Sequence, residues 1–550
     1  MTTPTSFQPA TRLRFCVERS DYRAAGVDDS YLDAWPAHPE LFPPSLGELS
    51  RVHEERLAFY QASPRRSALV EALRAAYRRL GLSGDELLAK LSRPDCMAIL
   101  SGQQAGLLMG PLYTHLKIMG TIRLAEVVPF PAVPVFWNAA EDADLSEIAD
   151  VVVPGRGGPA VYRLEVSRYP EGTMAASVPA SDFDLEEFAR WWETELRRTD
   201  FTDGLFTLLR STQAASASLG DWMTRLVHHF YGDRLLIVDP SWPELKPLGL
   251  GLVECELDRP NATAEEVNGA GKLLQAIGLP PRIHRPQDRT SFFFVRDGVR
   301  HRITWRDGRL HFDNESMAVE EFMQLLGDDP RGYSAGATFR PILQDALLPT
   351  VVTCLGPGEL AYHCQLGGAY LRLGVPRPAV VLRPSATLLE PQAAARLEKR
   401  GLDCRELAQP VEHLGKSLAA DGEGAVVTQE LAALRAQTGR VMASLRQEAH
   451  AIDAGLPAAL DKQEKNLLKV LDQVEDLLMR RLRDRNQSRM EQLAGLAALL
   501  FPDGGPQERR LNLFYFLNKY GPLFVKGLCA ALPATGEPVH ALVRWRVEAC

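Results

Sequence analysis

The stretch best suited to binding a small molecule is residues 101–116, SGQQAGLLMGPLYTHL, which follows a short apolar run at residues 97–100. The run predicts a buried strand, and the glycine-rich sequence after it predicts a loop that leads into a helix. Glycine lets the backbone approach a ligand closely, and a helix start presents unpaired N–H groups that favour an anion. The residues expected to contact a ligand here are Gly102, Gly106, Gly110, Gln103, Gln104, Tyr113, Thr114 and His115.

This loop matches neither the GxGxxG dinucleotide fingerprint nor a P-loop, so the sequence excludes both of these phosphate-binding motifs. A histidine at a helix start can donate a hydrogen bond to a phosphate or to a developing oxyanion. We therefore take His115 as a candidate catalytic residue; a solvent-facing helix histidine is the alternative.

A group of carboxylates follows a second apolar run at residues 132–137. With a helix expected between them, the two runs predict neighbouring parallel strands whose carboxyl ends meet at one edge of a sheet, where ligands gather. Carboxylates there could bind an amine, bind Mg²⁺ or accept a proton, whereas capping of the next helix is the alternative. The candidates are Glu141, Asp142 and Asp144 for catalysis, with Trp137 and Asn138 as substrate contacts.

A second strand–turn–helix element lies at residues 355–365, LGPGELAYHCQ. Its glycine turn could also expose backbone N–H groups toward the same cleft; a tight connection that needs glycine for packing is the alternative. Arginine suits a carboxylate or a phosphate, with a structural ion pair as the alternative. The ligand contacts expected from this half of the chain are Arg340, Gln344, Gly356, Gly358, Glu359, Tyr362, Arg383 and Ser385.

The remaining sequence predicts the elements that position these residues. Strand and helix patterns alternate in three separated segments, which indicates an α/β core around a parallel sheet. Asp-Gly pairs at 297–298 and 307–308 predict antiparallel hairpins in an insertion. The expected segments are an N-terminal helical segment at 1–92, core parts at 93–150, 226–254 and 336–389, insertions at 151–225 and 255–335, a coiled-coil hairpin at 390–490 and a C-terminal helical segment at 491–550.

Residues 390–490 carry apolar side chains at heptad-like spacing with charged residues between them, and the sequence GLP at 455–457 interrupts the pattern. This predicts two long helices folded into an antiparallel hairpin that serves as an arm or as a contact between copies. The apolar positions are Leu434, Val441, Leu445, Ile452, Leu460, Leu467, Leu471, Val474 and Leu478.

The composition excludes several classes of protein. A chain of 550 residues with 45% hydrophobic and 24% charged residues is expected to form two to four globular domains. The net charge of −8 argues against a nucleic-acid partner. The eight cysteines include no CxxC pair, so no zinc or other structural metal site is expected. With neither a signal-peptide pattern nor a membrane-length apolar run, we expect a cytoplasmic protein with free thiols and no membrane partner.

Five stretches together resemble the BshC family, the cysteine-adding enzymes of bacillithiol biosynthesis. The matching stretches are SGQQAGLLMGPLYT, PVFWNAAEDAD, FRPILQDALLPTV, GPGELAYHCQLG and FPDGGPQER. The resemblance implies a Rossmann-like core akin to class I aminoacyl-tRNA synthetases, two connective insertions and a coiled-coil domain that supports a homodimer. It also implies a ligase that joins cysteine to the amine of glucosaminyl-malate to give a low-molecular-weight thiol.

The resemblance assigns roles to particular residues. The sequence GPLYTHL takes the place of the synthetase HIGH-type signature, so Thr114 and His115 would face the activated group. Arg383 and Ser385 lie where a KMSKS-type loop would follow the last core strand, although its lysines are absent. Ala143 stands where the family pattern carries histidine, which leaves a different amine acceptor or a non-catalytic dimeric binding protein as alternatives. An ordinary synthetase or nucleotidyltransferase is disfavoured by the acidic composition.

Amide formation from a free carboxylate requires that the carboxylate is first activated. The resemblance implies ATP or ADP as the activating nucleotide, and Mg²⁺ could accompany it. An acyl-adenylate and an acyl-phosphate are both open as the activated species. The glycine turns would hold phosphates, a carboxylate would take the proton of the incoming ammonium, and Arg340 would hold a carboxylate such as the malyl group. The nucleotide would bind in the core cleft or beside the helical arm, near Arg509, Arg510 and Asn512.

Overall fold

A computed structural model describes residues 11–20, 29–61, 65–156, 158–408, 423–453, 455–534 and 540–549. The chain divides into two compact units. The first comprises residues 1–155, 160–391 and 506–550, and the second residues 156–159 and 392–505. The first ten residues, on which the expectation of no signal peptide rests in part, and Cys550 lie outside the described residues.

The first unit is built around a five-stranded parallel sheet with the strand order β13-β12-β2-β3-β6. The continuous apolar runs of the sequence form these strands because both faces of the sheet are buried. The strands are β2 (Met97–Gln104), β3 (Ala132–Ala139), β6 (Leu236–Val238), β12 (Thr350–Leu355) and β13 (Ala379–Leu382). The predicted α/β core is therefore confirmed.

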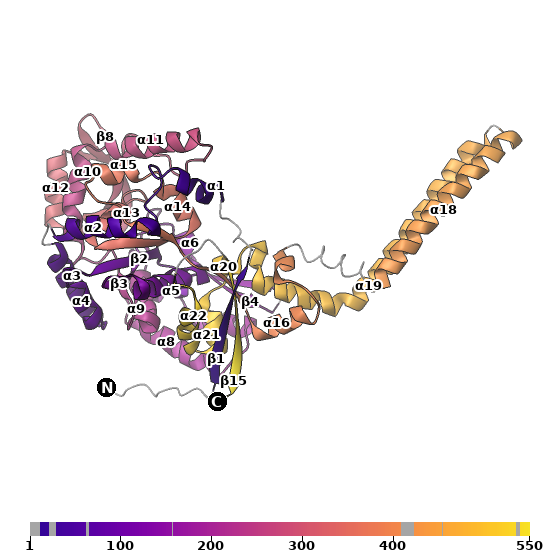
Figure 1. Cartoon of the computed structure of the whole chain (residues 1–550), viewed down its shortest axis with the longest axis horizontal. Helices are drawn as coiled ribbons and strands as arrows, with labels where there is room; N and C mark the ends of the chain where they lie inside the picture. Colours follow the sequence, from indigo (N-terminus) through magenta and orange to yellow (C-terminus); the bar gives the residue numbers. More distant parts are fainter. Residues whose placement is uncertain are drawn as a thin grey trace. The chain divides into compact units, whose positions relative to one another are not determined.

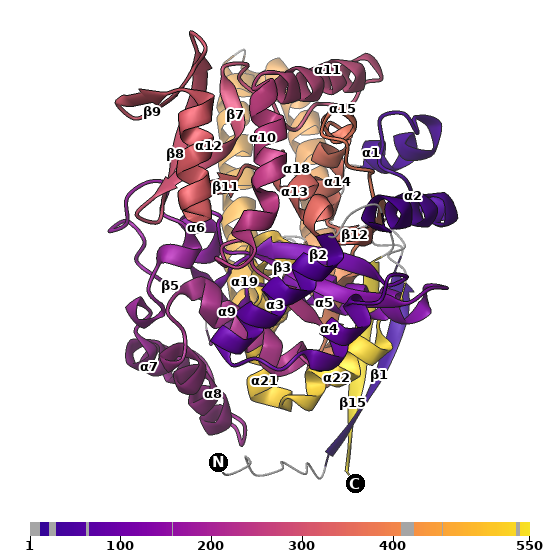
Figure 2. The same ribbon diagram turned by 90° about the vertical axis from the view of Figure 1, so that its left-hand side faces the viewer.

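Helices cover both faces of this sheet (Figure 2). On one face, apolar side chains of α3 and α4 pack against Ala98 and Leu100 of β2. On the other face, Met97 and Ile99 pack with residues of α2 and α5. Alternate residues of one strand thus enter two separate apolar clusters. These helices are α2 (Leu49–Gln61), α3 (Arg65–Leu80), α4 (Asp85–Leu91) and α5 (Leu112–Val127).

The two insertions carry the predicted small strands and hairpins. The first contains β4 (Asp150–Gly155), β5 (Gly158–Arg163), α7 (Leu185–Glu195), α8 (Thr202–Ala214) and α9 (Leu219–Tyr231). In the second, positive φ angles of Asp297, Gly298, Asp307 and Gly308 form the expected tight turns. Its strands are β7 (Arg289–Arg296), β8 (Val299–Arg306), β9 (Arg309–Phe312), β10 (Glu315–Met317) and β11 (Tyr333–Ala335), and its helices are α10 (Leu250–Asp258), α11 (Ala262–Ala276) and α12 (Val319–Asp328).

A third sheet corrects the prediction that both ends of the chain are helical. Strand β1 (Thr11–Ser20) pairs antiparallel with β15 (His540–Ala549), and β15 pairs in parallel with β14 (Ser385–Leu389). Figure 2 shows β1 and β15 side by side. The partners lie at opposite ends of the sequence, so no local pattern announces their pairing. The remaining C-terminal helices are α20 (Gln507–Arg510), α21 (Leu513–Tyr520) and α22 (Leu523–Ala531).

The second unit contains the predicted hairpin of long helices, α18 (Glu423–Ile452) and α19 (Leu456–Leu500), which run side by side in Figure 1. Arg435 lies 2.7 Å from Asp472 and Arg446 lies 3.0 Å from Asp461, which is the antiparallel register. The buried apolar residues of α18 are Leu431, Met442 and Ala449. Several predicted heptad positions are instead exposed, namely Leu434, Val441, Leu445, Ile452, Leu467, Val474 and Leu478. Among the described residues, none of the helices is long and apolar enough to cross a membrane.

Candidate functional site

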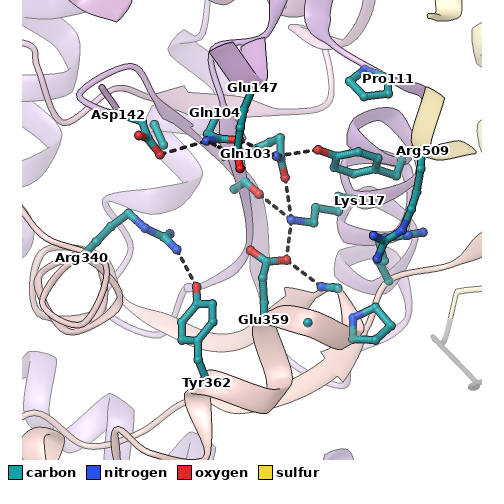
Figure 3. A pocket seen from close by; sticks show the side chains of 17 residues that line it. Gln103, Gln104, Pro111, Lys117, Asp142, Glu147, Arg340, Glu359, Tyr362 and Arg509 are labelled. Carbon is teal, nitrogen blue, oxygen red and sulfur yellow. Dashed lines mark hydrogen bonds and ion pairs between the residues drawn. The ribbon is translucent and has the colours of Figure 1, made fainter. Parts of the chain in front are cut away.

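A cavity of about 580 Å³ lies at the carboxyl edge of the parallel sheet (Figure 3). It gathers the ends of β2 and β3, the first turns of α5, and the helices α13 (Arg340–Leu347) and α14 (Pro357–His363). The predicted ligand contacts that line it are Gly102, Gln103, Gln104, Tyr113, Asp142, Arg340, Gly356, Gly358, Glu359, Tyr362 and Arg383. Arg509, expected beside the helical arm, also lines the cavity, and the lining residues that the sequence did not single out are Pro111, Lys117, Ala139, Glu147 and Pro357.

The two glutamines reach the cavity from a strand and not, as predicted, from a loop. Strand β2 continues through residues 102–104, which pair with residues 137–139 of β3. Gln103 Nε2 donates to the Tyr113 hydroxyl at 2.9 Å. Gln104 Nε2 donates to Asp142 at 3.1 Å and to Glu147 at 2.7 Å. Sheet pairing therefore fixes the backbone beneath both amides.

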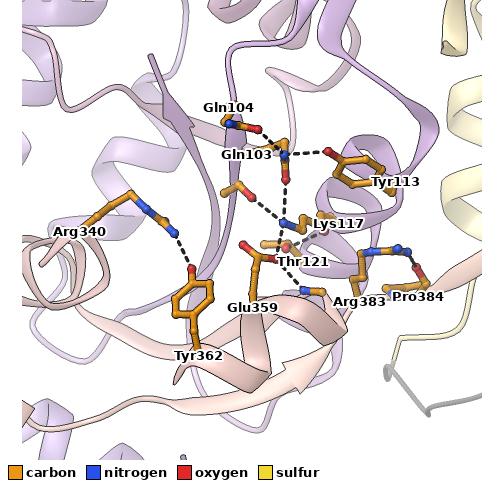
Figure 4. A network of polar contacts seen from close by, with 12 residues as sticks. Gln103, Gln104, Tyr113, Lys117, Thr121, Arg340, Glu359, Tyr362, Arg383 and Pro384 are labelled. Carbon is orange, nitrogen blue, oxygen red and sulfur yellow. Dashed lines mark hydrogen bonds and ion pairs between the residues drawn. The ribbon is translucent and has the colours of Figure 1, made fainter. Parts of the chain in front are cut away.

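Lys117, which is buried, and Glu359, which is 24% exposed, form an ion pair in the wall of the cavity, 2.5 Å apart (Figure 4). The Lys117 ammonium also donates to the carbonyl of Gly102 at 3.0 Å and to Gln103 Oε1 at 2.8 Å. Burial lowers the pKa of Lys117. Burial opposes ionisation of Glu359, but the Lys117 ammonium outweighs it and holds the pKa of that carboxyl below its ordinary value. Lys117 lies one turn beyond Tyr113, so the predicted helix phase could have revealed it.

Three arginines bring positive charge to the cavity. Arg340 donates to the Tyr362 hydroxyl at 2.8 Å, and burial raises the pKa of Tyr362 to about 12. Arg383 is neutralised by buried Glu508 at 2.6 Å. The Arg509 guanidinium is exposed and forms no ion pair with a described residue. Arg340 and Arg509 are therefore the two of these arginines that have no carboxylate partner among the described residues and can pair with an anionic ligand.

Two carboxylates of the cavity, Asp142 and Glu147, have no cation partner among the described residues, unlike Glu359. Asp142 and Glu147 share the Gln104 amide, and neither forms an ion pair with any described residue. Asp142 also accepts the backbone N–H of Asp144 at 3.0 Å. Two unneutralised carboxylates beside one amide can bind an ammonium group or accept its proton.

The other two predicted acids lie outside the cavity. Glu141 is buried in an ion pair with Lys246 and accepts a hydrogen bond from Ser334 at 3.2 Å. Asp144 is exposed at the start of α6 (Leu145–Ile148) and accepts from Ser146 at 2.6 Å. Glu141 therefore has the contacts of a structural ion-pair residue and Asp144 those of a turn residue. Glu147 takes the place beside Asp142 at the cavity.

Helix phase turns two predicted residues of α5 away from the cavity. Tyr113 and Lys117, four residues apart, face it, whereas Thr114 and His115 point into the core, where both are buried. His115 Nδ1 lies 3.0 Å from the Tyr231 hydroxyl, and burial lowers the pKa of His115 to about 3. The position and protonation of His115 correct its assignment as a candidate catalytic residue.

Three further predicted substrate contacts are core residues. Trp137 is fully buried and Gln344 is 3% exposed, and neither lines the cavity. Asn138 donates to the carbonyl of Gly220 at 2.9 Å and to Thr224 Oγ1 at 3.0 Å. The strand that carries Trp137 and Asn138 was predicted correctly, and Gln344 lies on α13, which was not predicted; all three side chains face inward.

The predicted phosphate-cradling turns use the N–H groups of Gly106, Gly110 and Gly356 for hydrogen bonds within the protein. A Cβ atom on Gly106 would lie 2.9 Å from the Cα of Gly110, so these glycines permit close packing. Asn512 donates to the carbonyl of Gly110 at 3.0 Å and to those of two neighbouring residues. In the second turn, the N–H of Gly356 already donates to Glu359 at 2.7 Å. The N–H groups of Gly106 and Gly110 also donate within the protein, to the carbonyls of Gln104 at 2.8 Å and Leu107 at 2.9 Å, so neither is left for a phosphate.

The last two predicted nucleotide contacts also lie outside the cavity. Ser385 hydrogen-bonds Glu508 at 3.1 Å and His540 at 2.8 Å, and Arg510 is not a lining residue, unlike its neighbour Arg509. The described residues include no group of three His, Cys, Asp or Glu side chains that could hold a metal ion.

Known proteins match nearly the whole chain. The family model "Bacillithiol biosynthesis BshC, N-terminal Rossmann-like domain" matches residues 27–384, and the BshC C-terminal coiled-coil domain matches residues 386–544. A relative from Bacillus licheniformis, named "Putative cysteine ligase BshC", is 28% identical over 491 residues, 87% of this chain and 90% of the relative. A relative of the same name from Chlorobaculum tepidum is 28% identical over 507 residues, 87% of this chain and 89% of the relative.

A solved structure titled as that of a "putative arginyl t-RNA synthetase" from Campylobacter jejuni also matches. It covers 86% of this chain and 100% of that protein, with 12% identity and a TM-score of 0.23. A likeness this weak carries no argument about fold or activity.

Proposed function

The chain belongs to the BshC family of bacillithiol biosynthesis, and we propose that its cavity joins cysteine to the amine of glucosaminyl-malate. One observation carries the assignment of this reaction to the cavity. Two carboxylates without cation partners, Asp142 and Glu147, share the Gln104 amide in the same cavity as Arg340 and Arg509. An acceptor with both an amine and carboxylates matches these opposite charges.

The carboxylate pair supplies the acid–base chemistry of the reaction. Asp142 and Glu147 hold the acceptor ammonium, and one of them takes a proton from it to free the nitrogen lone pair. The amine then attacks the activated carboxyl carbon of cysteine, the new C–N bond forms, and the phosphate or AMP leaving group departs with the electron pair of the broken C–O bond. Asp142 is the less exposed of the two acids and is our candidate for the base.

Activation of the cysteine carboxylate would come from ATP as co-substrate, with Mg²⁺ bound to the nucleotide. Since the N–H groups of Gly106, Gly110 and Gly356 already donate within the protein, Arg340 and Arg509 are the residues suited to its phosphates or to a substrate carboxylate. Formation of AMP would indicate an acyl-adenylate, and formation of ADP an acyl-phosphate.

Reconstitution tests the proposal directly. Purified protein with ATP, cysteine and glucosaminyl-malate should form bacillithiol, detected by mass spectrometry. Asp142→Asn should lower the rate by about 100-fold or more, the scale of general-base catalysis. Asp144→Asn, two residues away and outside the cavity, is the matched control and should keep the wild-type rate. Absence of product with wild-type protein, or equal losses in both variants, would contradict the proposal.

We also propose that the protein is a cytoplasmic homodimer formed through α18 and α19. The exposed apolar side chains on this hairpin support a partner of the same kind, because a surface of this sort is usually covered. Val441 and Leu445 are 50% and 48% exposed. Light scattering should give twice the chain mass of 60.9 kDa, and a Val441→Glu/Leu445→Glu variant should give the monomer mass. A wild-type monomer at micromolar concentration would contradict the dimer.

A further inference from the structure

The hydrogen bonds along one wall of the cavity have a fixed direction (Figure 4). An ammonium group only donates hydrogen bonds, so the Gln103 oxygen must face Lys117, at 2.8 Å. The Gln103 nitrogen therefore faces the other way and donates to the Tyr113 hydroxyl at 2.9 Å. Lys117 thus decides which end of the Gln103 amide reaches Tyr113.

The opposite end of the same network fixes the same direction. Ionised Asp142 and Glu147 only accept hydrogen bonds, so the Gln104 nitrogen must face them. Its oxygen is then left for the second N–H of Gln103, 3.5 Å away. Both amides are consequently oriented from both ends, by a cation on one side and by anions on the other.

This direction determines what the Tyr113 hydroxyl can do. Its oxygen already accepts the Gln103 hydrogen, and no described residue accepts its own hydrogen. The guanidinium of Arg383 lies over the Tyr113 ring, 5.5 Å from its centre. Burial raises the pKa of Tyr113, so the hydroxyl keeps its proton at neutral pH. A protonated hydroxyl on the wall of a cavity that Arg340 and Arg509 also line suits a negatively charged oxygen.

We propose that the Tyr113 hydroxyl donates a hydrogen bond to an anionic oxygen of the bound reactants, and that Gln103 is the positioning residue that aims it. The inference rests on the proposed ligase function, whose reactants carry carboxylate and phosphate oxygens. The same donor could serve a bound carboxylate or phosphate, or the oxyanion that forms when the amine attacks the carboxyl carbon.

Two substitutions separate this role from simple packing. Tyr113→Phe removes the donor and should lower kcat/KM by about 10- to 100-fold. Gln103→Glu presents an acceptor to both Lys117 and Tyr113, so it should turn the hydroxyl hydrogen away from the cavity and cause a similar loss. A rise in KM would indicate a bound carboxylate or phosphate as the acceptor, and a fall in kcat the reaction oxyanion. Tyr162→Phe, which removes an exposed hydroxyl outside the cavity, is the control and should leave kcat/KM unchanged.

The double variant decides between hydrogen-bond direction and added charge. If Gln103→Glu acts by redirecting Tyr113, it should cost at most about 3-fold in the Tyr113→Phe background, because the donor is already absent. A full additional loss would mean that the new carboxylate acts by repulsion and would overturn the role of Gln103. Wild-type kcat/KM in Tyr113→Phe would overturn the donor.

Binding measurements keep the inference distinct from the ligase proposal. If wild-type protein forms no bacillithiol, the ligase function fails, and calorimetric titration with ATP, cysteine and glucosaminyl-malate tests Tyr113 by itself. Weaker binding of at least one of these three to Tyr113→Phe and to Gln103→Glu supports the donor. Because a protein without turnover forms no reaction oxyanion, unchanged affinity for all three in that case would overturn the donor. Matching thermal melting curves should establish that the variants are folded.

Discussion

One glycine-rich stretch contains two regions with different roles, residues 102–104 and residues 106–110. The first three end a strand, and their amides line the cavity. The second group turns back on itself, buries Leu107, Leu108 and Met109, and is held by Asn512. Glycine at Gly106 serves the close approach of two protein backbones. A glycine pattern therefore does not reveal whether the neighbour of the backbone is a ligand or the protein itself.

The largest effect on stability should come from the cavity side. Lys117→Met leaves the Glu359 carboxylate without its cation and should lower the free energy of unfolding by about 3 kcal/mol, measured by urea denaturation at pH 7. The pair stabilises the native state at pH values above 4.5, the ordinary pKa of Glu359, and this contribution is lost as the pH falls through the lower native pKa.

In the variant, the Glu359 carboxyl lacks its cation and takes up a proton more readily, so the deficit should narrow at acid pH. Lys526→Met, on the exposed surface of α22, is the matched control and should stay within about 0.5 kcal/mol of wild type. Equal stability of Lys117→Met and the control would contradict a stabilising role of the Lys117–Glu359 pair.

On the packed side, Asn512→Ala should cost about 2 kcal/mol. The side chain caps α21 through the N–H of Phe514 and also satisfies carbonyl groups of the buried turn, Gly110 among them. Because none of these groups lines the cavity, kcat/KM of the folded variant should remain within about 3-fold of wild type. A large loss of activity without a loss of stability would contradict this expectation and indicate that the turn at residues 106–110 contacts the substrate.

A pair of glycine substitutions compares the two regions directly. Gly106→Ala should lower stability by about 1 kcal/mol, because its Cβ would overlap the Gly110 backbone, and should leave substrate affinity unchanged. A Cβ atom on Gly358 would have no atom within 4 Å and would occupy space in the cavity. Gly358→Ala should therefore keep full stability and weaken substrate binding. Thermal melting and KM measure the two effects, and a reversed pattern would break the comparison.

The smallest effect is expected at His115. Because its pKa is about 3, the imidazole stays neutral from pH 5 to pH 9, so His115→Gln should leave the pH profile of kcat unchanged. A native pKa below the ordinary value of 6.5 means that stability falls as the pH drops below 6.5. The variant should therefore show a weaker dependence of unfolding free energy on pH in that range. Loss of an inflection near neutral pH in the activity profile would restore His115 as a catalytic candidate.

Elements with a strong local signal could be predicted from the sequence. The sequence correctly predicted strands β2, β3 and β12, because burial on both faces requires a continuous apolar run. It also predicted the hairpins, from Asp-Gly pairs that adopt positive φ, and the two long helices, from their interrupted heptad pattern. The pairing of β1 with β15 could not be predicted, since each strand's partner is at the other end of the chain.

The candidate site was predictable by region and less so by residue. The edge of the sheet was correct, and Gln103, Asp142 and Arg340 reach the cavity. Errors arose where residues one or two positions apart point their side chains in opposite directions. Tyr113 faces the cavity, for example, whereas His115 faces the core. Arg509 arrives from a helix more than 120 residues after the last core strand, so only the three-dimensional structure brings it to the cavity.

The most direct test of the central claim is a crystal structure of the protein with glucosaminyl-malate bound. We expect its amine within hydrogen-bond distance of Asp142 or Glu147, with its malyl carboxylates toward Arg340 or Arg509. A ligand bound outside this cavity, or one whose amine points toward the arginines, would contradict the account.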